Sequence, residues 1–69
     1  MEVKMINVTS EAIKSIGWDT QNKKLIVELY NGTYAYDAPR TEHDNLLKAK
    51  SHGKYFNNSI RNKFKFELL

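Results

Sequence analysis

The chain has 69 residues, no cysteine and a net charge of +3, and 41% of its residues are apolar. This length indicates one domain, 1–69, with a thin core. Without cysteine, a disulfide framework, a cysteine-based zinc site and a thiol nucleophile are excluded. No apolar run approaches the roughly 18 residues of a membrane helix, and the first residues lack the core of a signal peptide. We therefore expect a soluble globular protein of the cytoplasm with no membrane association.

The first clear element is a short strand at 14–19, in which apolar and polar residues alternate. A four-residue loop, 20–23, separates it from a second alternating segment at 24–30. This loop length would place Trp18 opposite Leu25 in an antiparallel pair.

The next signal is the dipeptide Asn31-Gly32 between two alternating segments, 24–30 and 33–37. Asn-Gly supplies the two positive-φ positions of a type I′ turn, so it predicts a tight hairpin in which Leu29 faces Tyr34. The two loops then agree on one buried face. The side chains on that face are Ile16, Trp18, Leu25, Val27, Leu29, Tyr34 and Tyr36.

Two helices are predicted after the sheet. Pro39 ends the last strand and suits the first turn of a helix over 40–51, in which apolar residues recur at helical spacing. Gly53 is placed to end that helix as a C′ glycine. A second helix is predicted over about 54–62, where two apolar residues stand four positions apart.

The two ends of the chain, 2–8 and 64–68, also alternate like strands, and one option is that they pair with each other. The elements together predict an α+β fold. Its centre is a three-stranded antiparallel meander, which the N- and C-terminal strands can extend, with two short helices packed on one face.

Charge is distributed unevenly along the chain. Residues 1–44 carry five basic and seven acidic residues, whereas residues 45–66 carry six basic residues and no acidic one. Such a basic, aromatic-containing segment indicates an anionic partner; the alternative is that its lysines solvate helix faces and are neutralised by acids of the first half. The basic residues of the segment are Lys48, Lys50, Lys54, Arg61, Lys63 and Lys65.

We find no motif for catalysis, for a cofactor or for a metal. The histidines lie nine residues apart; we expect His43 to be a packed, hydrogen-bonded helix residue and His52 a solvated loop residue. Glu42 and Asp44 flank His43, but neighbours on a helix point about 100° apart and cannot converge on one atom. The sequence therefore favours a protein that is not an enzyme.

The order of these signals resembles the KTSC domain over about residues 8–64. This domain is named for its place at the C-terminus of some lysyl-tRNA synthetases, and it also occurs as a small bacterial or phage protein. The chain departs from the family at three positions. The family more often has Tyr at Trp18, Val at Ala38 and an apolar residue or Tyr at His43. The strings that carry the resemblance are Val8-Thr9-Ser10, Ile16-Gly17-Trp18-Asp19, Leu25-Ile26-Val27-Glu28-Leu29, Asn31-Gly32, Tyr34-Ala35-Tyr36, Ala38-Pro39 and Ser51-His52-Gly53-Lys54-Tyr55-Phe56-Asn57-Asn58-Ser59-Ile60-Arg61.

The two most specific strings are the Tyr-x-Tyr at Tyr34 and Tyr36 and the string from Ser51 to Arg61. Tyrosines on a sheet can stack on bases, but the expected register puts both on the buried face, so we interpret them as core residues. Tyr30, on the other face, is the better stacking candidate. We interpret the signature residues as structural, with Asn57 capping the turn at Gly53 or hydrogen-bonded to it. These residues are Tyr34, Tyr36, Gly53, Tyr55, Phe56, Asn57 and Ile60.

The leading hypothesis for function is a binding module for RNA or another nucleic acid, acting through the basic residues of 48–65. For the family, RNA binding is suggested because the domain occurs in the same chain as a tRNA synthetase. This is an association and not a mechanism. The start of the second helix, with Lys54, is an expected anion site. One alternative is a protein-interaction module, such as a phage protein acting on a host partner, using the exposed sheet face or an edge strand. Another is an accessory domain whose tyrosines and Asn57 bind a small ligand. The candidate nucleic-acid-binding residues are Lys48, Lys50, Lys54, Arg61 and Lys63.

Overall fold

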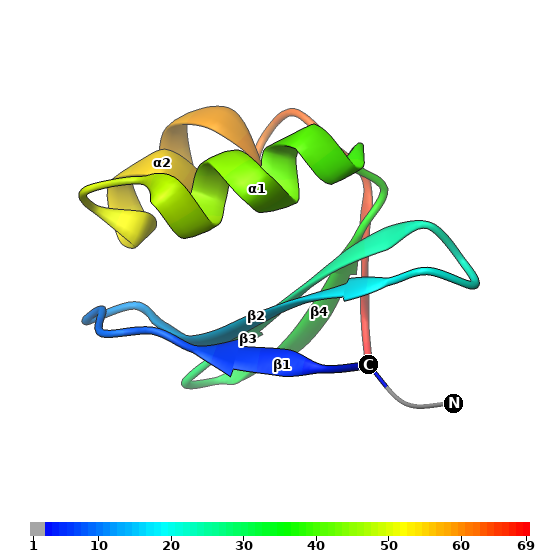
Figure 1. Cartoon of the computed structure of the whole chain (residues 1–69), viewed down its shortest axis with the longest axis horizontal. Coiled ribbons are helices and arrows are strands. Elements are labelled where there is room, and N and C mark those ends of the chain that lie inside the picture. Colours follow the sequence, from blue (N-terminus) through cyan, green and yellow to red (C-terminus); the bar gives the residue numbers. More distant parts are fainter. Residues whose placement is uncertain (1–2) are drawn as a thin grey trace.

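The computed structural model describes residues 3–69. Five strands form one antiparallel sheet in the order of the sequence, and both helices lie against the same side of it (Figure 1). The predicted α+β class is confirmed, and the three-stranded meander is the centre of a five-stranded one. The elements are β1 (Met5–Asn7), β2 (Ile13–Asp19), β3 (Lys24–Leu29), β4 (Gly32–Tyr36), α1 (Arg40–Lys48), α2 (His52–Ser59) and β5 (Phe66–Leu68).

The terminal strands lie at opposite edges of the sheet. β1 pairs with β2, where Met5 faces Gly17, and β5 pairs with β4, where Phe66 faces Tyr36. A direct pairing between the two ends of the chain, which the sequence left as an option, is therefore wrong. Each end instead extends the meander on the side where the neighbouring strand offers free backbone groups.

The hairpin between β3 and β4 has a different register from the predicted one. Leu29 pairs with Gly32, so the loop is Tyr30-Asn31 and the pairing is shifted by two residues. The positive φ belongs to Gly32, at 154°, and not to Asn31, which is incompatible with the expected type I′ turn. A shift of two preserves the faces of the strand, so Tyr34 and Tyr36 still point toward the helices.

The loop between β2 and β3, residues 20–23, is confirmed, with Trp18 opposite Leu25. The carboxylate of Asp19 organises it by accepting hydrogen bonds from the backbone N–H of Gln21 and of Asn22 (3.1 and 3.2 Å) and from the Asn22 amide (2.9 Å). The hydrogen bond from the Asn22 side chain is the main cause that lowers the pKa of Asp19.

A β-bulge brings two isoleucines of β2 into the core. Ile13 and Ser15 pair with consecutive residues of β3, which leaves Lys14 without a partner in the ladder. Ile13 and Ile16 would point to opposite faces of a regular strand, but both are fully buried here. The predicted strand began at residue 14 and missed this contribution, because strict alternation cannot show a bulge.

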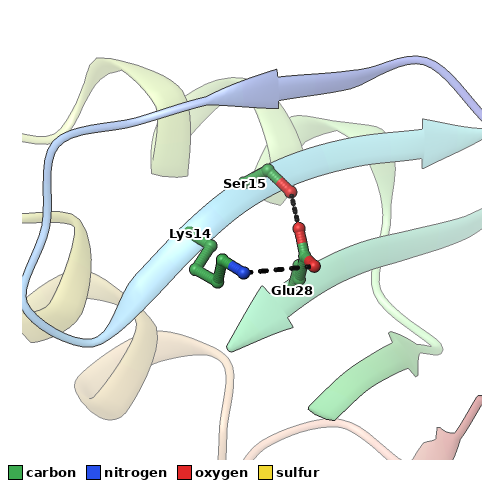
Figure 2. A network of polar contacts seen from close by, with 3 residues as sticks. All are labelled: Lys14, Ser15 and Glu28. Carbon is green, nitrogen blue, oxygen red and sulfur yellow. Dashed lines mark hydrogen bonds and ion pairs between the residues drawn. The ribbon is translucent and has the colours of Figure 1, made fainter. Parts of the chain in front are cut away.

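The bulge also assembles a small polar network (Figure 2). The buried Ser15 hydroxyl donates to Glu28 Oε1 at 2.7 Å, and Lys14 Nζ lies 3.9 Å from Glu28 Oε2. Because Lys14 and Glu28 remain partly exposed, the ion pair itself adds little stability. The hydroxyl matters more, since it would otherwise be buried without a partner.

The core lies between the sheet and the two helices. Tyr36 is 3% exposed and meets Phe56 of α2 edge to face, with ring centroids 5.4 Å apart. This contact confirms the interpretation of Tyr36 as a core residue. The buried residues of this core are Ile13, Ile16, Leu25, Val27, Tyr36, Ala38, Leu46, Phe56 and Ile60.

The boundary between the helices differs from the prediction. α1 ends at Lys48, and Gly53 lies inside α2 rather than ending α1. Ser51 caps α2 instead, because its side-chain oxygen accepts a hydrogen bond from the Lys54 N–H at 3.3 Å. No helix among residues 3–69 is long and apolar enough to cross a membrane.

Two hydrogen bonds connect the helices. His52 Nδ1 donates to the Leu46 carbonyl at 2.8 Å, so His52 is not the solvated loop residue that the sequence predicted. The Tyr55 hydroxyl donates to Glu42 Oε1 at 2.6 Å, and this bond is the main cause that raises the pKa of Tyr55. The helices thus form one layer that covers the sheet.

Replacing Tyr36 with Ala should lower the free energy of unfolding by about 3 to 5 kcal/mol, because it removes a buried ring at the centre of the core. Tyr30→Ala is the matched control, since Tyr30 is 65% exposed, and it should change stability by less than about 0.5 kcal/mol. Urea denaturation measures both. Should Tyr36→Ala fail to fold, Tyr36→Phe keeps the ring and should retain most of the stability; equal losses for the two alanine variants would contradict the core assignment.

Two glycine substitutions should have opposite effects on stability. A Cβ at Gly17 would lie 2.9 Å from the Lys4 carbonyl oxygen, so Gly17→Ala should push β1 away and cost about 1 to 3 kcal/mol. A Cβ at Gly53 would meet Ala12 at an ordinary 3.5 Å, and Gly53→Ala should stabilise by about 0.4 to 1 kcal/mol by restricting the unfolded chain. Denaturant midpoints of the two variants check the opposite signs.

Candidate functional site

A cleft of about 620 Å³ opens where the hairpin loop, β4, β5 and the end of α2 meet. We call it the aromatic cleft. Its size is within the range of small-ligand sites. Its aromatic residues are Tyr30, Tyr34, Tyr36, Phe56 and Phe66, and its polar residues include Glu11, Asn57, Arg61 and Asn62.

The aromatic rings of the cleft contact one another in series. Phe66 lies 5.6 Å from Tyr34 and 5.5 Å from Tyr36 between ring centroids. Yet Phe66 is 57% exposed, because β5 is an edge strand and the helices do not cover it. The cleft therefore has a rigid aromatic base and an aromatic ring open to solvent.

Arg61 brings a positive charge to this aromatic surface. The chain leaves α2 in a tight turn, in which the Arg61 N–H donates to the Phe56 carbonyl at 2.8 Å. The Arg61 guanidinium then donates to Asn57 Oδ1 at 3.5 Å. Asn57 is exposed and faces Arg61, so the expected bond from Asn57 to the turn at Gly53 is not formed; the reason is that this turn lies within α2.

The same charge acts on the buried tyrosine. Burial raises the pKa of Tyr36, and the positive charge of Arg61 acts in the opposite direction. Arg61 and Tyr36 line the same cleft, and the positive guanidinium favours the ionised form of the hydroxyl.

The predicted basic residues lie mostly in two further hollows beside the cleft. Lys50 and Lys54 line a hollow of about 620 Å³ at the start of α2, and Lys63 and Lys65 line one of about 470 Å³ before β5. The first hollow shares Glu11 and Ala12 with the aromatic cleft, and the second shares Asn62 and Phe66 with it. Lys48, at the end of α1, lines none of these three.

Ion pairs do not neutralise this segment within residues 3–69. The pairs there join Lys14 to Glu28, Lys24 to Asp37, and His43 to Asp44 when the histidine is protonated. Glu2, one of the acids that the sequence offered as a neutralising partner, lies outside the described residues. The expected anion site at the start of the second helix is altered, because the helix begins at His52 and the Ser51 side chain already accepts from the Lys54 N–H.

The histidines do not form a metal site with the acids around them. His43 is buried beside Trp18, with ring centroids 6.2 Å apart, and its Nδ1 bonds to Asp44 at 3.0 Å. No cluster of three or more His, Asp or Glu side chains among residues 3–69 has the arrangement that a metal needs.

A model of the KTSC domain matches residues 9–64. The chain belongs to the KTSC domain family. It is similar to the crystal structure of a KTSC domain protein from Yersinia pestis, with 33% sequence identity, 99% of each chain covered and a TM-score of 0.90. Among curated proteins, none matches the chain.

The two strings that are most specific to the KTSC resemblance meet in the aromatic cleft. Tyr34 and Tyr36 come from β4, and Phe56, Asn57 and Arg61 come from the string that begins at Ser51. Tyr36 and Phe56 are buried, but Tyr34, Asn57 and Arg61 remain accessible. Part of the signature is therefore available to a ligand as well as to the core.

The sequence interpretation missed four members of the cleft: Glu11, Ala12, Asn62 and Phe66. Phe66 follows the residues matched by the KTSC model, and only its pairing with Tyr36 brings it to the site. The signal that could have found it was the alternation of 64–68 together with the apolar face of β4.

Removing the charge of Arg61 should raise the pKa of Tyr36 further, because the positive guanidinium opposes the effect of burial on that hydroxyl. Titration of the Tyr36 ring by NMR measures this in Arg61→Gln. Lys63→Gln, which also removes one positive charge, is the control and should leave the pKa of Tyr36 unchanged. An equal effect of the two variants would mean that Arg61 does not lie near the hydroxyl.

Proposed function

We propose that this KTSC domain is a non-enzymatic module that binds single-stranded RNA through the basic residues of 48–65. The observation that carries the proposal is the continuous series of three hollows, in which basic side chains flank an aromatic cleft. Lys50 and Lys54 lie in the hollow that borders the cleft at Glu11 and Ala12, and Lys63 and Lys65 lie in the hollow that borders it at Asn62 and Phe66.

The charge on this surface is available to phosphates. No ion pair among residues 3–69 involves the basic residues of the segment. Lysines without acidic partners can exchange condensed counterions for a phosphate backbone. Among residues 3–69, Glu11 is the one acidic residue that lines the series of hollows, and it lies where the cleft meets the Lys50 hollow.

The aromatic cleft favours a single strand over a duplex. Bases in a duplex are stacked on each other and their faces are covered, whereas single-stranded ligands present faces that stack on aromatic side chains. An association of related domains with lysyl-tRNA synthetases would be in keeping with an RNA ligand, but domain company is not a mechanism.

A second candidate function is protein interaction through the outer face of the sheet. That face carries a groove of about 650 Å³ with Ile26 and Ala35 in its floor and Met5 and Leu69 on its sides. Its accessible acidic side chains are Glu28, which is paired with Lys14, and Glu67, and its Lys24 is paired with Asp37. This chemistry suits a basic peptide with apolar side chains.

RNA binding should weaken steeply as salt increases. With four to six basic residues in contact with phosphates, the slope of log affinity against log salt should be roughly −3 to −5. The double variant Lys54→Glu, Arg61→Glu should bind all sequences more weakly and show a slope shallower by about 1 to 2, because phosphate contacts do not distinguish bases. Fluorescence anisotropy with a labelled oligonucleotide measures both.

The matched control is Lys4→Glu. Lys4 is an exposed residue directly before β1 and lines none of the three hollows. It should retain the affinity and slope of the unmodified protein. Absence of binding to RNA at low salt would end this proposal. The second candidate function, protein interaction through the groove on the outer face of the sheet, would then be favoured by one result. Protein partners would stay on the immobilised domain after nuclease treatment and would be lost from the Ile26→Asp variant.

A further inference from the structure

We infer that the aromatic cleft holds one unstacked nucleobase of the bound strand, against Phe66 and Tyr34, with a neighbouring phosphate on Arg61. This inference rests on the proposed function and assigns a separate task to the cleft. The lysines of the flanking hollows would bind backbone, whereas the cleft would bind a base.

The first reason is the open ring of Phe66. Exposed phenylalanine is unfavourable in water, and its ring is fixed by contacts with Tyr34 and Tyr36 at 5.6 and 5.5 Å. A ring that is held in place loses little entropy when a ligand stacks on it. Tyr30, at 65% exposure on the hairpin loop, adds a second open aromatic ring to the cleft.

The second reason is the set of polar side chains beside these rings. Arg61 has five N–H donors, and its bond to Asn57 is long at 3.5 Å, so most of its donors are free for a phosphate. The amides of Asn57 and Asn62 offer both donors and acceptors to a base edge. Aromatic faces, amides and one cation together match a nucleotide better than a purely apolar ligand.

The third reason is the position of Glu11, the only acidic residue among 3–69 that lines these hollows. Glu11 lies at the border between the cleft and the Lys50 hollow, and its carboxylate would repel a phosphate there. Within the cleft, a phosphate is therefore favoured at Arg61 rather than beside Glu11. Lysines in both flanking hollows make an internal nucleotide of a strand the natural occupant.

The inference is tested with the full chain and two labelled ten-residue strands at low salt, one of oligo(A) and one of the same backbone with every base removed. Stacking on aromatic side chains predicts that oligo(A) binds about 5- to 150-fold more tightly. Phosphate contacts alone predict equal affinity. Anisotropy titrations of both strands give the ratio directly.

The variants Phe66→Ala and Leu68→Ala locate this difference. Both residues are exposed apolar side chains of β5, at 57% and 64%, but only Phe66 lines the cleft. Phe66→Ala should weaken oligo(A) binding at least 5-fold and leave the baseless strand unaffected. Leu68→Ala should change neither, and Phe66→Tyr should restore oligo(A) binding.

The failures of the two proposals differ. Equal affinity for both strands, or equal effects of Phe66→Ala and Leu68→Ala, would overturn the base site and leave phosphate-driven binding intact. If neither strand binds, the proposed function fails, and adenosine monophosphate is then titrated against the protein by NMR. Shifts confined to Tyr34, Arg61 and Phe66 would support the cleft as a nucleotide site, and their absence would overturn it.

Discussion

The ring of Tyr36 packs at the point where β4, β5 and α2 meet, and the rest of the structure depends on this contact. Phe56 holds it from the helix layer and Phe66 from the edge strand, at 5.4 and 5.5 Å between centroids. A chain of this size can bury few large side chains, so one aromatic ring at such a junction carries an unusual share of the packing. The same ring forms the inner wall of the aromatic cleft. Stability and the candidate site therefore share a residue.

Much of the fold follows from the sequence because local signals and the buried face agree. The four-residue loop at 20–23 and the alternation of its two strands predict the β2–β3 register correctly. The predicted register of the hairpin between β3 and β4 is wrong by two residues. The prediction placed both Asn31 and Gly32 in the turn at positive φ, whereas only Gly32 has a positive φ and it already pairs with Leu29. The prediction of which side chains face the helices is still correct, because side chains on the same face of a strand recur every two residues.

What the sequence could not predict depends on contacts between distant elements. The bulge at Lys14 exists because Ile13 and Ile16 both have apolar surface to bury, and a pattern based on alternation has no place for it. The helix boundary at Ser51 was missed because Gly53 is an equally good signal when the cap is not considered. The basic residues of 48–65 were found from composition. Their arrangement around an aromatic cleft depends on β5, which pairs with the neighbouring strand β4 at Tyr34 and Tyr36.

The strand order has a consequence for how the site forms. β2, β3 and β4 each pair with the strand before them through a short connection, whereas β5 reaches β4 only after both helices, across residues 37–65. Closing this long segment costs more chain entropy than closing a hairpin. Because Phe66 travels with β5, the cleft exists only while the edge strand is docked. A molecule bound there would stabilise the docked position of the C-terminal strand. Its measured affinity would therefore include the free energy of keeping that strand in place.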